Sequence, residues 1–265
     1  MISTVLAQAG GAAADPTTAW GWLNDSSQRT VSGPIPSQLW TTLWHAVLAF
    51  AIAAAIAIPL AAVLAHRRRA EVAATTLVNL GRVIPTVSIL GFAVLISLRK
   101  GYGFEPWPIV FALVALALPP LFANTYTAVR DASPDAVGAA RGLGMGEGAI
   151  LRQVELPLAM PLILATCRVT LVQVVATEAL GALFSSGGLG IYVRFGFAGS
   201  DAAQIQAGAL LVAGTAMAVD LVFWLVTRYA VPEPLRPPRR RPRAAAPTSG
   251  PLEIFTQPRT LGGTP

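Results

Sequence analysis

The feature that most constrains the fold is a series of long apolar segments that carry almost no charge. Residues 39–65 and 107–128 contain no Asp, Glu, Lys or Arg. A helix rises about 1.5 Å per residue, so each segment can cross a bilayer core of about 30 Å. With 54% hydrophobic and 12% charged residues, the chain is too apolar for a soluble domain. We predict an all-α, polytopic bundle of membrane helices.

The apolar segments divide into about five expected spans. Proline is expected to kink the first at Pro59, to bend the second at Pro85 and to interrupt the third at Pro119–Pro120, because it removes a backbone donor. A broken helix at membrane depth needs neighbouring helices around it, which places these segments inside a bundle. The expected spans are residues 39–65, 72–98, 107–128, 158–184 and 206–229.

The basic residues set the expected topology in the inner or plasma membrane. The run His66-Arg67-Arg68-Arg69 ends the first span, and basic residues near span ends mark the cytoplasmic side. Residues 1–38 are then a mobile segment outside, and residues 231–265 a disordered, basic Pro/Arg-rich tail in the cytoplasm, close to anionic lipid. This topology puts inside Arg67, Arg68, Arg69, Arg130, Arg141, Arg152, Arg228 and the tail arginines, and outside Arg29, Arg99, Lys100 and Arg194.

A polar, glycine-rich hairpin at residues 131–157 separates two apolar segments. Ser133-Pro134-Asp135 is a helix-start signal for a helix that runs to about Arg141. Glycines at every second position from 142 to 148 favour a sharp turn. A second short helix is expected near Glu147, with Arg152 and Glu155 able to pair and Pro157 closing the segment. The hairpin has the form of a plug for a groove on another protein.

The hairpin resembles the EAA loop of ABC importer permeases. Ala139-Ala140, Gly144 and the final Val154-Glu155-Leu156-Pro157 have the spacing of that motif, with Gly138 where the family usually has Glu. The resemblance implies a type I ABC importer transmembrane domain over residues 39–230, whose cytoplasmic coupling helix docks on a separate ATPase. The coupling residues it implies are Gly138, Ala139, Ala140, Gly144, Val154, Leu156 and Pro157. Without the Glu, weaker charge complementarity is expected; the alternative is an ordinary amphipathic loop.

Two other segments are similar to the osmoprotectant permeases. Ile84-Pro85-Thr86-Val87-Ser88 resembles a segment that lines their transmission path, and Ser186-Gly187-Gly188-Leu189-Gly190 resembles one at their outer gate. The stretches AARGLGM and VELPLAMP are most similar to importers of glycine betaine, carnitine and choline. Compatible-solute uptake is therefore the expected function, and another small solute, such as an amino acid, is the nearest alternative.

Four charged residues, Arg82, Arg168, Glu178 and Asp220, lie in the interior of the expected spans. Each costs about 2.5–3.5 kcal/mol on insertion scales and should face the bundle interior, water or a partner. Asp220 can pair with Arg168 or Arg82, while Glu178 has no evident acid–base partner and can bond to the glycine loop. Bundle-stabilising pairs and a role in the pathway both remain open. The candidate gate and path residues are Pro85, Ser88, Arg168, Glu178, Gly187, Gly188, Gly190 and Asp220.

The sequence contains no motif for chemistry of its own. It has no phosphate-binding loop, no metal-ligand spacing and no nucleophile elbow. We expect no cofactor in this chain, with ATP and Mg²⁺ on the ATPase. The expected partners are two ATP-binding subunits, a second permease subunit of the same or a paralogous kind, an extracytoplasmic solute-binding protein and membrane lipid, but no nucleic acid. An ion-coupled secondary transporter and a non-transporting scaffold are alternatives of other classes.

Overall fold

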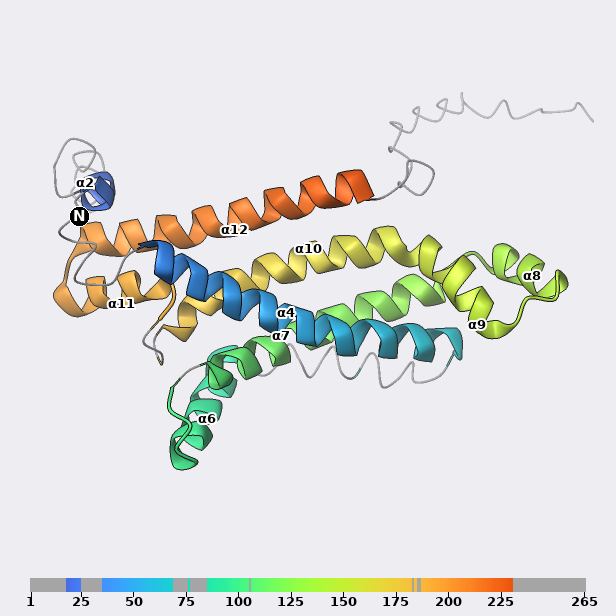
Figure 1. The fold of residues 1–265 in the computed structure, drawn as a ribbon, viewed down its shortest axis with the longest axis horizontal. Helices are drawn as coiled ribbons and strands as arrows, with labels where there is room; N and C mark the ends of the chain where they lie inside the picture. Colours follow the sequence, from blue (N-terminus) through green and yellow to red (C-terminus); the bar gives the residue numbers. More distant parts are fainter. Residues whose placement is uncertain are drawn as a thin grey trace, which may run out of the picture.

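The structure, a computed structural model, describes residues 18–24, 35–68, 76, 85–104, 106–182, 184 and 187–230. These residues form helices joined by short turns, and the predicted all-α membrane bundle is confirmed (Figure 1). Four helical segments are long and apolar enough to cross a membrane. The long helices are α4 (Ile35–His66), α7 (Trp107–Arg130), α10 (Leu156–Gly181) and α12 (Ala202–Ala230).

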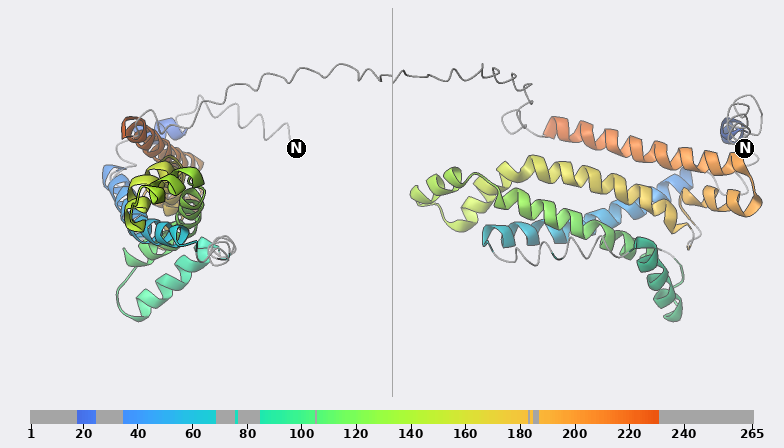
Figure 2. Two further views of the ribbon diagram at one scale, coloured as in Figure 1. Left: turned by 90° about the vertical axis from the view of Figure 1, so that its right-hand side faces the viewer. Right: turned by 180° about the vertical axis from the view of Figure 1, so that it is seen from behind.

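Shorter helices lie at the two ends of this bundle. At one end, which we call the hairpin end, are α8 (Pro134–Gly142), α9 (Glu147–Ile150) and the π-helix η1 (Leu151–Glu155), which runs directly into α10. At the other, the loop end, are α2 (Ala19–Asn24), α11 (Gly190–Gly199) and the turn at residues 187–189. Helix α6 (Thr86–Arg99) points away from the bundle (Figure 2).

The core forms where α4 lies along α7. One face of α4 carries buried alanines at helical spacing, which allow the two helices to approach closely. Helix α7 is the most enclosed of the four long helices, and α12 is the least covered. The buried alanines of this face are Ala46, Ala49, Ala53, Ala57 and Ala61.

The predicted interruption at Pro119–Pro120 is wrong, because both prolines lie inside an unbroken α7. Pro59 likewise lies inside a continuous α4. Helices α4 and α10 both pack on α7. This packing keeps α7 helical although Pro119 and Pro120 lack the N–H groups that would donate backbone hydrogen bonds. Pro157 does not close the hairpin either, since it sits in the first turn of α10. The preceding π turn, in which the Leu156 N–H donates to the Leu151 carbonyl, widens the backbone just before the proline ring.

Four of the five expected spans coincide with long helices of the structure. The second differs, because α6 has only 14 residues, about 21 Å of helix, and most of residues 72–84 lie outside the described part. Helices α4 and α12 each begin four residues before the expected spans at 39 and 206. Helix α11 was not predicted. The segments 1–38 and 231–265 lie mostly outside the described residues, although α2 packs on α11 through Trp22 and Tyr192, whose ring centroids are 5.4 Å apart.

Candidate functional site

The hairpin is built as the sequence predicts. The Ser133 hydroxyl accepts from the Ala136 N–H at 3.4 Å and caps α8. Gly144 then turns the chain with φ +80°, a left-handed conformation that favours glycine. Val137, Ala140 and Ile150 form a small buried core between the two helices, against which Met145 and Val154 pack. The hairpin is therefore a compact unit with its own apolar centre.

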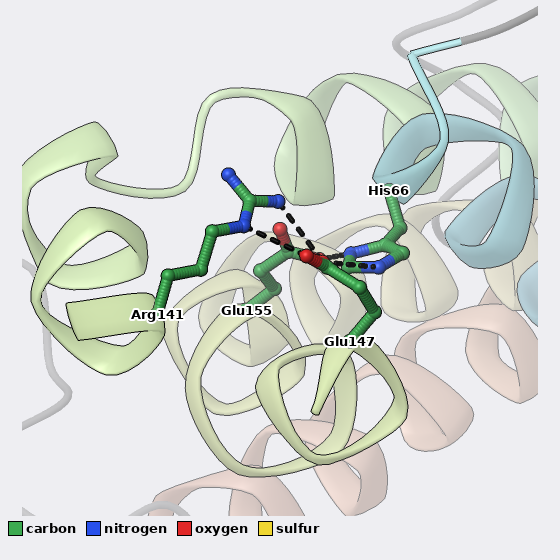
Figure 3. Close-up of polar contacts among 4 residues, drawn as sticks. All are labelled: His66, Arg141, Glu147 and Glu155. Atoms are coloured by element: carbon green, nitrogen blue, oxygen red, sulfur yellow. Dashed lines mark hydrogen bonds and ion pairs between the residues drawn. The ribbon is translucent and has the colours of Figure 1, made fainter. Parts of the chain in front are cut away.

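A cluster of charged side chains ties this unit to the end of α4 (Figure 3). Arg141 donates from Nε and Nη2 to the two carboxylate oxygens of Glu147, at 2.8 and 2.9 Å. The hydrogen bonding of Arg141 to the Glu147 carboxylate raises the pKa of Arg141 above its ordinary value. His66 lies between two carboxylates, with Nε2 at 3.1 Å from Glu147 and Nδ1 at 2.7 Å from Glu155. Glu155 thus pairs with His66 instead of Arg152, the partner considered above.

A second polar cluster lies at the loop end, within the bundle. Glu178 is 1% exposed, and its Oε1 lies 3.1 Å from the His45 Nδ1. No partner of Glu178 is evident in the sequence, and the structure shows that α4 supplies one in His45. The second carboxylate oxygen, Oε2, is buried without a hydrogen-bond partner among the described residues. Such a group is costly to bury, which marks the position as a candidate for function.

The glycine turn closes over this cluster. The Gln38 side chain of α4 accepts a hydrogen bond from the Gly188 N–H, and the Thr42 hydroxyl accepts one from the Leu189 N–H, both at 2.8 Å. Gly188 has φ +86°, and a Cβ there would lie 2.7 Å from the Glu178 Oε1. A Cβ on Gly190 would lie 2.0 Å from the carbonyl oxygen of Ala179. Only glycine allows the turn to approach α10 this closely.

The remaining candidate path residues lie elsewhere. Arg168 and Asp220 form a two-pronged ion pair between α10 and α12, with Nε–Oδ1 at 2.6 Å and Nη2–Oδ2 at 2.5 Å. Arg82, the other partner considered for Asp220, is outside the described residues. Pro85 and Ser88 are exposed at the start of α6. Thr86, of the same turn, lines a narrow cleft together with Glu178, so this turn adjoins the loop-end cluster.

Comparison with known families identifies the family of the chain that carries this arrangement. The model for the binding-protein-dependent transport system inner membrane component matches residues 53–233. The chain belongs to this family. It is the permease component of an ABC importer in the inner membrane, and it works with an ATP-binding subunit and a solute-binding protein.

Similar proteins support this assignment of the permease over most of its length. The osmoprotectant import permease protein OsmW of Salmonella typhimurium is 30% identical over 200 residues, covering 76% of this chain and 92% of OsmW. The glycine betaine/carnitine/choline transport system permease protein OpuCB of Bacillus subtilis is 27% identical, covering 73% and 87%. The inward-facing MetNI methionine ABC transporter has the same fold, with a TM-score of 0.65 at 23% identity over 74% of this chain and 94% of that one.

The structure separates the seven predicted coupling residues of the permease into two groups. Gly138, Ala139 and Gly144 are exposed on the hairpin surface. The others hold the hairpin together or join it to the bundle: Ala140 and Val154 belong to its small core, Leu156 packs on the main core and Pro157 begins α10. The first group is available for contact with a partner, and the second fixes how the surface is presented.

Sequence reasoning missed three residues that the structure places at these sites. Leu143, at the tip of the hairpin, is 83% exposed, and such an exposed apolar residue beside a motif was itself a usable signal. His66 belongs to the run that ends the first expected span, and His45 lies within the apolar segment of that span. Their partners are 89 and 133 residues away in the sequence, so no local pattern could have identified them.

Gly144→Val is expected to reduce uptake by about tenfold in the assembled transporter. A β-branched residue in a left-handed conformation costs about 1–3 kcal/mol, which the turn would relieve by changing shape. Gly101→Val is the matched control, because Gly101 has φ +76°, open space around it and a position in the loop after α6. Uptake normalised to protein in the membrane measures both, and equal losses in the two variants would contradict a special role for the hairpin turn.

Proposed function

We propose that residues 131–157 are the element that an ATP-binding subunit holds, and that this permease imports osmoprotectants such as glycine betaine, carnitine or choline. The observation that carries the proposal is that the spacing of the coupling motif coincides with a compact hairpin at one end of the bundle. Its exposed residues Gly138, Ala139 and Leu143 form a small, mainly apolar surface. A groove on a soluble partner can accept such a surface.

The proposed orientation puts the hairpin end in the cytoplasm. Arginines gather where helices reach this end, which agrees with the rule that basic residues stay inside. The loop end then faces outward, with the N-terminus outside and the C-terminus inside. The arginines near the hairpin end, among the described residues, are Arg67, Arg68, Arg130, Arg141 and Arg152.

The proposed assembly contains two copies of the hairpin. The four membrane-length helices found among the described residues are too few to enclose a path, so the proposal includes a second permease subunit, the same or a paralogue. Two ATP-binding subunits then hold one hairpin each and bind ATP and Mg²⁺, for which this chain has no motif. An extracytoplasmic binding protein delivers the solute. The family assignment leaves no place for the secondary-transporter and scaffold alternatives.

The proposed gate is the loop-end cluster of Glu178 and the turn at Gly187, Gly188 and Gly190. Closure of the ATPases on ATP moves the hairpins, and the turn opens outward until hydrolysis resets it. Pro85 and Ser88 belong to the same turn as Thr86, which lines a narrow cleft with Glu178, and the Arg168–Asp220 pair holds α12 to α10 as the bundle moves. Their place along the path is part of the same proposal.

The osmoprotectant proposal rests on the relatives named above and not on a binding pocket. The test reconstitutes the permease with its ATPase and binding protein in liposomes and measures ATP-dependent uptake of radiolabelled glycine betaine, carnitine, choline and methionine. Uptake of at least one quaternary ammonium solute, without methionine uptake, is the expected result. Methionine uptake alone would overturn the proposed substrate class. ATP-driven uptake by a transporter whose ATPase does not contact the hairpin would overturn the proposed coupling role.

A further inference from the structure

Helix α4 is attached to functional elements at both of its ends. At the hairpin end, His66 contacts Glu147 of α9 and Glu155 of η1 (Figure 3). At the loop end, Gln38 and Thr42 hold the glycine turn. The helix between them has 32 residues without a break, about 48 Å in length. One rigid element therefore joins the hairpin to the proposed gate.

The contact at His66 depends on the charge of the imidazole. Both ring nitrogens face carboxylate oxygens, which can only accept hydrogen bonds when ionised. The protonated ring donates from both nitrogens, whereas the neutral ring donates from one and turns a lone pair toward the other carboxylate. The protonated form is the one that satisfies both contacts.

The charged groups around His66 keep this arrangement in place. Arg141 binds both oxygens of Glu147 and so orients that carboxylate. Glu155 is buried where η1 meets α4, and the His66 side chain is 11% exposed. The other charged side chains on the surrounding described elements are Arg67, Arg68, Arg130, Asp131, Asp135 and Arg152.

We propose that α4 transmits movement of the hairpin to the glycine turn, and that protonated His66 is the positioning residue that makes this connection. The inference rests on the proposed docking of the hairpin on an ATPase. Movement of the hairpin pulls on the end of α4 through His66, and the opposite end carries the turn through Gln38 and Thr42. Without the contact between His66 and Glu147, the hairpin moves and α4 lags behind it.

The test compares His66→Gln and His66→Arg in the complete transporter in liposomes. Glutamine carries no charge and has its donors on a single nitrogen, whereas arginine keeps a charge and donates from several nitrogens. We expect His66→Gln to bind the ATPase and hydrolyse ATP but to lose about tenfold in solute imported per ATP hydrolysed. His66→Arg should retain most of this ratio. A ratio unchanged in His66→Gln would overturn the inference.

Rescue by arginine is the readout that a merely structural role would not give, because arginine differs from histidine in size and shape but keeps the charge and the donors. If His66→Arg loses the ratio as His66→Gln does, charge at this position does not make the connection and the inference is wrong.

A cysteine at the turn tests the opposite end of α4. Cys167 is the single cysteine and Leu189 is fully buried, so a Cys167→Ala/Leu189→Cys permease reports opening of the turn by thiol labelling. Nucleotide trapping should accelerate labelling at least fivefold when His66 is kept, and should leave the rate unchanged when His66→Gln is added. Equal acceleration in both, with the ATPase bound, would overturn the inference alone. Failure of the ATPase to co-purify with any variant would instead overturn the proposed function.

Discussion

Replacing Leu143 with arginine is expected to abolish assembly of the permease with its ATP-binding subunit. Leu143 ends α8 at the tip of the hairpin and is 83% exposed, so the permease itself should fold as before. In a docked complex the same side chain would fill an apolar site, where loss of an anchor residue costs about 2–4 kcal/mol. An arginine would add the cost of burying an unpaired charge.

The measurement is co-purification of the ATPase with the permease in detergent, together with uptake. A loss of more than about 30-fold in affinity is expected from that energy. Leu143→Met is the matched control, since methionine keeps the apolar volume. Intact assembly in Leu143→Arg would show that the Leu143 side chain is outside the docking surface, and would leave Gly138, Ala139 and Gly144 as the remaining exposed candidates.

Replacing Glu178 with leucine is expected to destabilise the bundle by about 1–3 kcal/mol, because it leaves the buried His45 side chain without its hydrogen-bond partner. Thermal unfolding in detergent measures the effect. The double variant His45→Leu/Glu178→Leu should recover most of the stability, since two apolar side chains then replace a buried polar pair. A double variant as unstable as the single one would show that the two side chains do not act together.

Glu178→Gln separates stability from gating. Glutamine can keep one hydrogen bond to His45 with almost the same shape, so the bundle should remain folded. If Glu178 belongs to the gate, this variant should still lose uptake, because the charge next to the turn is gone. Unchanged uptake and unchanged stimulated ATPase activity would remove Glu178 from the proposed gate.

Features set by neighbouring residues could be predicted from the sequence. The start of α8 at Ser133-Pro134 and the turn at Gly144 follow from local backbone preferences. The pair of Arg168 with Asp220 could be proposed because the spans contain so few charges that each has few partners. The long spans follow from apolar length alone.

Features that depend on packing could not be predicted from the sequence. Residues 190–199 contain three glycines, which predicts a loop, yet Gly190 belongs to a helix because its missing side chain permits close contact with α10. Pro119–Pro120 fits a helix only because neighbours enclose α7. The contacts of His45 and His66 join segments far apart in the chain, so they can be identified only once the fold is known.

The π-helix between α9 and α10 gives the permease a joint that tolerates a change in chain length. Residues 151–155 wind more loosely than an α-helix, so this segment holds a residue that regular winding would not need. Removing one residue from a regular α-helix rotates everything before the deletion by about 100° around the helix axis. Removing one residue here would instead return the segment to regular winding, so the surface offered to the ATPase would keep its direction.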